Sequence, residues 1–431
     1  MKIKVREGLL PFKIEQSNEP LIARGGLILP YEAAKALKLP KVIDRELPIP
    51  DSGRGYRPSL FVMPLLLMLH GGGKKLEDLR EIRDETSLRE LLEMKQLPAS
   101  CTMGDWLRRM GENSKGLAGL GKVSQHLNTE ILIRDPRTEY TLDHDATVIE
   151  AEKEEAQWTY KKEKGYQPLM GFLFELGFIL DDDFREGNVP AGYGALEFLK
   201  RCLALMPSGK RISYFRSDSA AYQAGVINCC FERNILFTIT ADQDQGVKEA
   251  IKTIKGNEWQ SYEKDRQIAE TVHTMNKTNQ AFRLIVQRWP KIQPDLFDPT
   301  PYFYHAIASN RAEEAKEVVS LHNQRGQVEN FIKELKDGFG MNWMPCGETY
   351  ANAVYFRIGV IAYNLFQALK LLALPIWWRK ATIATARWKL YQVAAKVVSH
   401  AHQVIIKLAT SIEKICLFQR ARYIYAQLEC G

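Results

Sequence analysis

The chain has 431 residues, of which 45% are hydrophobic and 26% are charged. This composition is typical of a folded globular protein and excludes collagen-like and wholly disordered classes. The length is about three times that of an average domain, so we expect two or three structural units. The formal net charge of +7 permits a polyanionic partner without requiring one.

Cysteine usage and hydropathy bear on where the protein works. The seven cysteines form no Cys-x-x-Cys pair, which favours a reducing compartment over a disulfide framework or a zinc site. Residues Met1 to Arg6 lead into no signal-peptide segment, so we expect a cytoplasmic protein. The run from Thr349 to Leu374 is long enough to span a bilayer but includes charged and amide side chains. We expect it to be a buried core helix, and we expect no membrane partner.

Residues 1–135 are expected to form a mainly helical region after a short extended start. Apolar residues recur near helical spacing, as at Leu76, Leu79 and Ile82. The Lys and Arg residues of this region are interleaved with acids. A solvated helical face and a DNA-binding module therefore both remain open as interpretations.

Residues 136–245 have the pattern of an α/β domain. Period-two alternation predicts a strand at 140–149, and two strands are expected within 169–180, ending at the turn-rich 181–183. Helix, strand, helix and strand then follow, at 194–205, 212–216, 222–232 and 235–240. This is the element order of an RNase H-like fold, although periodicity alone predicts only a generic α/β class.

Residues 246–312 interrupt this pattern with β-like runs. Since a structureless loop of that size is improbable inside a compact domain, we expect a small inserted β subdomain. Helical patterns resume in 313–375, which we assign to the second part of the α/β core. Residues 376–431 contain nine Lys or Arg and two acids, and we expect a basic helical C-terminal region. A track for DNA phosphates and a dimer contact are both open as its role.

Three acids stand where an α/β sheet could bring them together. Period two places Asp143 and Asp145 on one face of the first strand, where two carboxylates must be solvated, paired or bound to metal. One structural and one solvated Asp is an equally good interpretation. Asp218 follows the strand at 212–216, a usual position for ligand sites and also for a helix N-cap.

The third acid belongs to a polar stripe on a helix. At about 100° per residue, His322, Arg325, Glu329 and Lys336 fall within an arc of about 60°, at the margin of an apolar face. A carboxylate there can look into a cleft, whereas a surface charge stripe is the alternative interpretation.

Two residues near this stripe have different predicted orientations. Lys333 lies close enough to the arc to join it, but Glu334 falls more than about 100° away and should face solvent. We therefore expect Glu329, and not Glu334, to be the functional acid.

These motifs resemble the bacterial insertion-sequence DDE transposases. The signature Y-x2-R-x3-E-x6-K is matched between His322 and Lys336 at three of its four positions, with His in place of Tyr. Asp145 to Thr147 resembles the motif around the first acid of that family, and Arg216 to Ser219 loosely resembles the second. Residues 158–173 and 226–244 look like the thirteen-eighty group of insertion sequences.

The resemblance implies a DNA transposase that binds terminal inverted repeats and catalyses metal-dependent strand cleavage and strand transfer in cut-and-paste transposition. Asp145 would bridge two Mg²⁺ ions, for which Mn²⁺ would substitute, while Asp218 and Glu329 would each complete one ion. Asp143 would lie behind these ligands or face solvent. An RNase H-like nuclease without strand transfer, or a catalytically silent DNA-binding protein derived from a transposase, would be the alternatives.

The resemblance also implies DNA contacts. Double-stranded transposon ends and target DNA would be the partners, and a homodimer would hold two ends together. In the inserted region Trp259 or Trp289 could stack on an extruded base, although core packing is the commoner role of such side chains. The residues that would contact DNA phosphates are His322, Arg325, Lys333 and Lys336.

Overall fold

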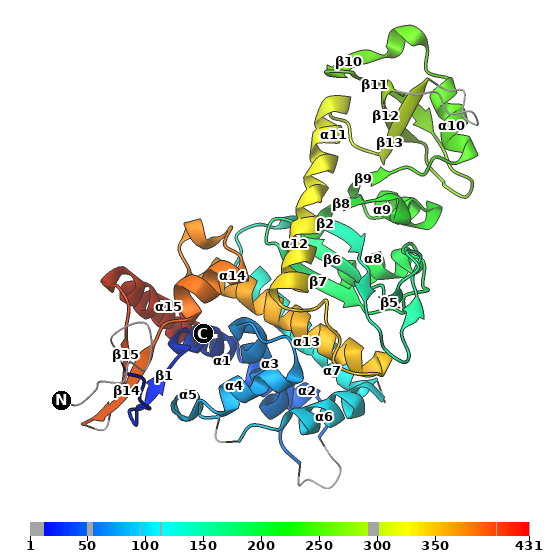
Figure 1. Ribbon diagram of the computed structural model, residues 1–431. Coiled ribbons are helices and arrows are strands. Elements are labelled where there is room, and N and C mark those ends of the chain that lie inside the picture. The colour runs from blue at the N-terminus through cyan, green and yellow to red at the C-terminus, as the bar shows by residue number, and fades with distance from the viewer. Residues whose placement is uncertain are drawn as a thin grey trace, which may run out of the picture.

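The computed structural model describes residues 13–49, 55–94, 96–112, 114–291, 301–401 and 403–430. The expectation for Met1 to Arg6 lies outside these residues. Figure 1 shows an elongated molecule, with a helical part at one end and a central sheet that extends into an arm carrying β10 to β13 at the other.

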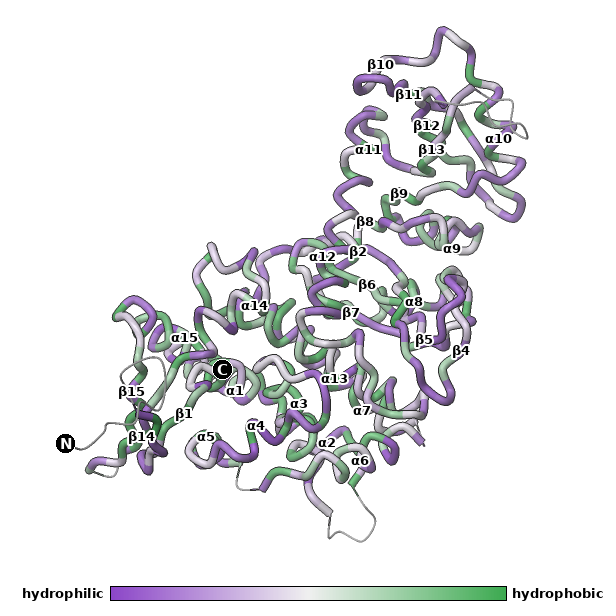
Figure 2. Tube along the Cα trace, viewed as in Figure 1, coloured by the Kyte–Doolittle hydropathy of each residue, from purple (hydrophilic) through white to green (hydrophobic). Residues whose placement is uncertain are grey.

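The helical part is built around α13, Thr349–Ala368, which packs against α3, α6 and α7. The predicted helical character of residues up to about 135 is confirmed within the described residues, and α3 is coloured as hydrophobic along most of its length in Figure 2. The helices of this part are α1 Ile28–Ala36, α2 Leu39–Glu46, α3 Ser59–Gly71, α4 Arg80–Arg83, α5 Thr86–Leu91, α6 Ser100–Glu112 and α7 Lys115–Leu132.

α13 is a buried core helix, as its sequence predicts. With its π-helical continuation Leu369–Ala373 it is long and apolar enough to cross a membrane, but 83% of its most apolar window is buried inside the protein. Its polar side chains have partners there: Asn364 accepts a hydrogen bond from the backbone N–H of Ile179 at 2.9 Å, and Arg357 is paired with Asp182 at 2.5 Å. The helix therefore binds the edge strand of the central sheet through polar as well as apolar contacts.

The central sheet has the order β10-β11-β12-β13-β9-β8-β2-β6-β7. β2, β8 and β9 are parallel to one another, while β6 is antiparallel to β2 and β7 is antiparallel to β6. The strand bounds are β2 Glu139–Ala146, β6 Leu169–Leu173, β7 Phe178–Asp183, β8 Arg211–Ser217, β9 Leu236–Thr240, β10 Gln260–Glu263, β11 Arg266–His273, β12 Phe282–Pro290 and β13 Tyr302–Ser309.

The strand and helix order predicted for residues 136–245 is confirmed, with two differences at strand ends. β7 continues through Asp183 because it pairs with β6 up to the Leu169–Asp183 position, so the three acids do not form a turn. β2 ends at Ala146, and the chain then enters a small sheet of order β3-β5-β4: Ile149–Glu150, Lys164–Tyr166 and Gln157–Trp158. The intervening helices are α8 Ala195–Ala204 and α9 Ala224–Glu232.

The inserted residues are rich in strands, and these strands do not stand apart from the central sheet. β13 pairs antiparallel with β9, for example Ile307 with Thr240, so the insertion continues the central sheet. The reason is that β9 would otherwise present an unpaired edge of N–H and C=O groups. Helix α10, Gln245–Lys252, precedes these strands, and α11, Ala315–Asn323, packs on them through a small second core that includes Val318 and Val319.

The C-terminal region is only partly helical, unlike the prediction. Its middle is a hairpin of β14, Ala395–His400, and β15, Gln403–Leu408, and β14 also pairs with β1, Leu21–Ile22. The hairpin is rich in β-branched residues, which favour strands. The remaining elements are the 3₁₀ helix η8 Ile376–Trp378, α14 Ile383–Ala386, the π-helical turn η9 Arg387–Tyr391 and α15 Ile412–Cys430.

Candidate functional site

Asp145 lies near the carboxyl end of β2, in the middle of the central sheet. Its side chain is only 13% exposed. Burial raises the pKa of Asp145 to about 6; Arg325 opposes this shift, and the negative charges of Asp218 and Glu329 add to it. The three predicted acids thus interact electrostatically around Asp145.

Asp218 directly follows β8, the parallel neighbour of β2. The register pairs His144 with Ser217, so Asp145 and Asp218 are carried to the same edge of the sheet, where parallel strands end and ligands commonly bind. Asp218 also accepts a hydrogen bond from the backbone N–H of Ala220 at 3.0 Å. The functional and the N-cap interpretations are therefore compatible with one geometry.

Arg325 joins these two acids. One terminal nitrogen of its guanidinium lies 3.2 Å from a carboxylate oxygen of Asp145 and 3.5 Å from one of Asp218. The Asp145 and Asp218 oxygens are therefore separated by at most the sum of these two distances. This is close enough for both carboxylates to serve one two-ion site. Nε of Arg325 is buried without a hydrogen-bond partner in the described part of the chain. The pair of acids already accommodates a shared positive charge.

Glu329 is exposed on α12, Gln327–Lys333, one helical turn beyond Arg325. Among the described residues, no three His, Cys, Asp or Glu side chains are gathered closely enough to hold a metal ion. The donor set nevertheless fits Mg²⁺, because all three groups are carboxylates and hard oxygen ligands are the ones this ion prefers. The geometry brings Asp145 and Asp218 together and leaves Glu329 as a nearby, separate carboxylate.

Asp143 is not a solvated acid. It is fully buried and receives two hydrogen bonds from Arg216, at 2.6 and 2.7 Å, from the residue directly beside it on β8. Burial raises the pKa of Asp143, and the guanidinium opposes that shift. The sequence pattern does not single out Arg216 as this partner, although parallel pairing of the two predicted strands places it beside Asp143.

The side chain of His322 is not at the protein surface, unlike the DNA contact that the resemblance implies. It is buried, with Nδ1 and Nε2 each 3.1 Å from a threonine hydroxyl, those of Thr238 and Thr240 on β9. Burial lowers its pKa to about 3, so the ring is neutral at pH 7. A 3₁₀ turn, Gln324–Gly326, separates α11 from α12, so the angular spacing of one regular helix does not hold between His322 and Glu329.

Lys336 and Lys333 have different environments. The ammonium of Lys336 donates a hydrogen bond to the backbone carbonyl of Val148 at 2.6 Å, and burial lowers its pKa. This contact fixes the end of the acidic helix, meaning α12 with its π-helical continuation Glu334–Gly338, to the segment that follows Asp145. Lys333 is exposed and remains available to a ligand.

Glu334 does not face solvent, contrary to expectation. It is half-buried, and its carboxylate accepts a hydrogen bond from the backbone N–H of Ile383 at the start of α14. Burial raises its pKa. The chain from Glu334 to Gly338 is π-helical, which changes the angular spacing assumed for a regular helix. Glu334 therefore has a structural contact with α14, whereas Glu329 is exposed.

The two candidate stacking residues lie in the extended arm of the sheet. Trp259 is 9% exposed and is covered by the guanidinium of Arg288, 3.9 Å from its ring centre. Trp289 is partly exposed beside Arg266, at 4.9 Å. The packing interpretation thus fits Trp259, while Trp289, whose ring centre also lies 6.0 Å from that of Phe303, is less fully covered.

Together, fold and site define a mixed α/β protein with carboxylates gathered at the end of a large mixed sheet. A family model described as transposase DDE domain group 1 matches residues 12–429, almost the whole chain. The chain therefore belongs to this family of DNA transposases, which act on DNA phosphodiesters.

Two other comparisons complete the picture. The structure is similar to a cryo-EM structure of piggyBac transposase in a synaptic complex with hairpin DNA, with a TM-score of 0.48 and 11% sequence identity. The similarity covers 86% of this chain and 80% of that one. No curated protein matches the sequence significantly.

Proposed function

We propose that this protein is an insertion-sequence transposase that binds double-stranded transposon ends, cuts them and joins them to target DNA by a cut-and-paste route. The observation that carries the proposal is the meeting of Asp145 and Asp218 at one sheet edge, with Glu329 on the helix that also supplies Arg325. A cluster of carboxylates at the end of a parallel pair is suited to phosphodiester chemistry with divalent ions.

The strand order supports an RNase H-like core. From the β7 edge, the strand order is β7-β6-β2-β8-β9. Neighbours among β7, β6 and β2 are antiparallel, and β8 and β9 are parallel to β2. This is the arrangement that the strand-strand-strand-helix-strand-helix-strand order of the sequence predicts. β10 to β13 then extend the sheet beyond β9.

The proposed site would take Mg²⁺, or Mn²⁺ in its place, on Asp145, Asp218 and Glu329. Bound ions would activate the attacking oxygen and stabilise the leaving oxygen. The protein's own contribution is positional: β2 and β8 fix the first two acids, and the contact of Lys336 with Val148 holds the acidic helix against the segment after β2. We propose that a homodimer acts on paired ends in the cytoplasm.

The test is an in vitro reaction with DNA carrying the two ends that flank the coding sequence. Wild-type protein with Mg²⁺ should release the ends and join them to a plasmid, while Asp145→Ala, Asp218→Ala and Glu329→Ala should bind the ends but do neither. Cleavage without joined products would instead indicate a nuclease. End binding without either reaction in the wild type would indicate a silent transposase derivative.

A further inference from the structure

The segment from Ile376 to Lys389 exposes tryptophans and cations together. Trp377 is 74% exposed and Trp388 is 77% exposed. Single exposed aromatic side chains are common, but several of them exposed on one short segment together with cations can mark a binding surface. Arg379, Lys380 and Lys389 are exposed beside them in the sequence.

This segment is devoid of acids. Between Pro375 and Ile412 the sequence contains neither Asp nor Glu. Within the described ranges, no ion pair involves Arg379, Lys380 or Lys389; Arg379 does donate a hydrogen bond to the carbonyl of Leu371 at 2.9 Å. A neighbouring carboxylate, that of Asp135, opposes the lowering of the Arg379 pKa by burial, but Asp135 is ion-paired with Arg137 at 2.9 Å and not with Arg379.

The segment is anchored to the helical run that carries Glu329. The carboxylate of Glu334 accepts the N–H of Ile383, and Arg387 donates to the carbonyl of Gly338 at 2.7 Å. Arg387 also donates to the carbonyls of Leu69 and His70, so this cation is used inside the protein. A ligand lying on the exposed residues would thus be held at a fixed position relative to the acidic helix.

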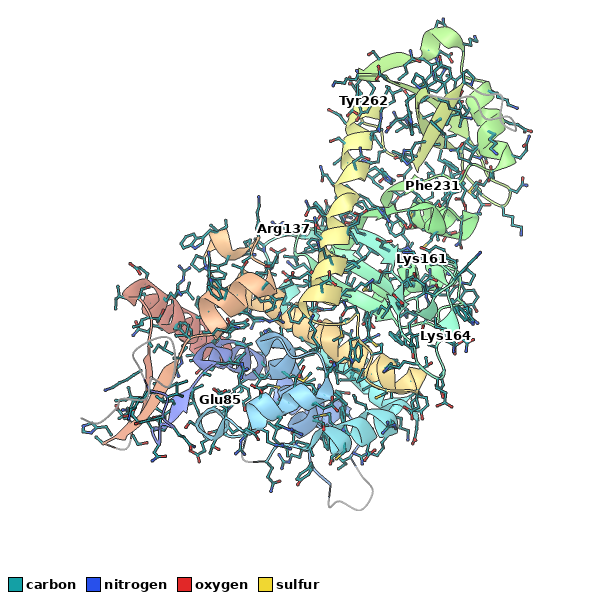
Figure 3. All side chains as sticks on the ribbon, in the orientation of Figure 1. Glu85, Arg137, Lys161, Lys164, Phe231 and Tyr262 are labelled. Atoms are coloured by element: carbon teal, nitrogen blue, oxygen red, sulfur yellow. The ribbon has the colours of Figure 1, made fainter. Side chains whose placement is uncertain are left out.

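A further cation lies on the same side of the molecule. Arg137 precedes β2 and is close enough to Arg379 to lower its pKa, although burial is the larger cause of that shift. Figure 3 labels Arg137 near α12, on the side that carries the orange α14 segment. Arg137 is itself paired with Asp135 at 2.9 Å, so it adds no unpaired positive charge, and the positive charge of this surface is that of Arg379, Lys380 and Lys389.

We propose that Trp377, Arg379, Lys380, Trp388 and Lys389 form a docking surface for duplex DNA, which holds the DNA flanking the reacting bond. The proposal rests on the proposed function. Cations without a carboxylate partner are complementary to phosphates, and exposed indole rings can pack on the sugars of the DNA backbone. A second copy of the chain is a poorer occupant, because a symmetric contact through this surface would bring identical cations together.

The test compares DNA affinity across salt concentrations for wild type and for the triple variant Arg379→Ala, Lys380→Ala, Lys389→Ala. Each lost phosphate contact should reduce the slope of log affinity against log salt by about 0.9. Between 50 and 200 mM salt, wild type should therefore lose roughly 40-fold more affinity than the variant. Because phosphates carry no sequence information, the slope should change equally for transposon-end and unrelated duplexes.

Aromatic and charge controls make the test specific. The double variant Trp377→Ala, Trp388→Ala should lower affinity without changing the salt slope. Arg83→Ala removes a partly exposed cation that is paired with Asp84 at 3.5 Å, and Tyr423→Ala removes an aromatic side chain that is 67% exposed on α15. Both controls should bind as wild type does.

Three results would overturn the proposal. The first is an unchanged salt slope in the triple variant. The second is a loss of DNA affinity in the Arg83→Ala control equal to that in the triple variant. The third is a wild-type dimer in DNA-free sedimentation that becomes a monomer in the triple variant while the salt slope stays unchanged. Failure of the proposed function looks different. In that case the surface variants would still weaken DNA binding, but wild-type protein would neither cut nor join DNA.

Discussion

Replacing Asp143 by Asn should destabilise the protein strongly, although the residue contacts no predicted metal site. The Arg216 side chain is 6% exposed and that of Asp143 is 0% exposed, so the substitution leaves a guanidinium buried without its counterion. Removing one partner of such a pair costs about 3–5 kcal/mol. We expect a fall in Tm of roughly 3–10 °C at pH 7.5, measured by circular dichroism on metal-free protein.

The matched control is Asp145→Asn, the same substitution two residues along the strand. Because burial holds the pKa of Asp145 near 6, its charged form is disfavoured in the fold, and Tm should stay the same or rise. The double variant Asp143→Asn, Arg216→Met should recover part of the loss, since it removes the stranded charge. A wild-type Tm for Asp143→Asn would refute the inference that this pair is a buried structural contact.

Two further predictions concern the acidic helix and the helical core. Glu334→Gln should cut and join DNA at near wild-type rate, because Gln can still accept the Ile383 N–H, whereas Glu329→Gln should be inactive; the reverse order would exchange their roles. Burial lowers the pKa of His70 to about 3, so the unfolded chain binds a proton there that the folded chain excludes between about pH 6.5 and 3. The free energy of unfolding should therefore fall as pH drops through that window, by about 1.4 kcal/mol per pH unit from this residue. His70→Gln should show a flatter dependence of Tm on pH than wild type. Parallel curves of Tm against pH for the two proteins would contradict this prediction.

The strand order of the core could be predicted because its signals are local. Alternation and apolar runs mark β2, β6, β8 and β9, and short connections favour their neighbouring positions. The attachment of β13 to β9 could not be predicted in the same way. The β2–β8 pair is as distant in sequence but belongs to the RNase H-like element order, whereas no local pattern in the insertion marks β13 as the partner of β9. The C-terminal hairpin was missed because its basic character, and not its β-branched content, guided the interpretation.

In the candidate site, too, local patterns predict some positions and not others. Asp145 and Asp218 follow from strand ends, which the sequence marks clearly. The positions of His322 and Glu334 do not, because a 3₁₀ turn and a π-helical turn alter the angular spacing of one continuous polar stripe. Tertiary contacts with β9 and α14 stabilise these irregular turns, and no local pattern records them.

The most direct test of the site is to locate Mn²⁺ by anomalous scattering in crystals of the protein bound to a transposon end. The account predicts Mn²⁺ coordinated by Asp145 and Asp218, with Glu329 brought in as a ligand and the Arg325 guanidinium moved from between the two aspartates. Mn²⁺ bound at other residues, or Asp145 and Asp218 still joined by Arg325 without a metal ion in an active complex, would contradict it.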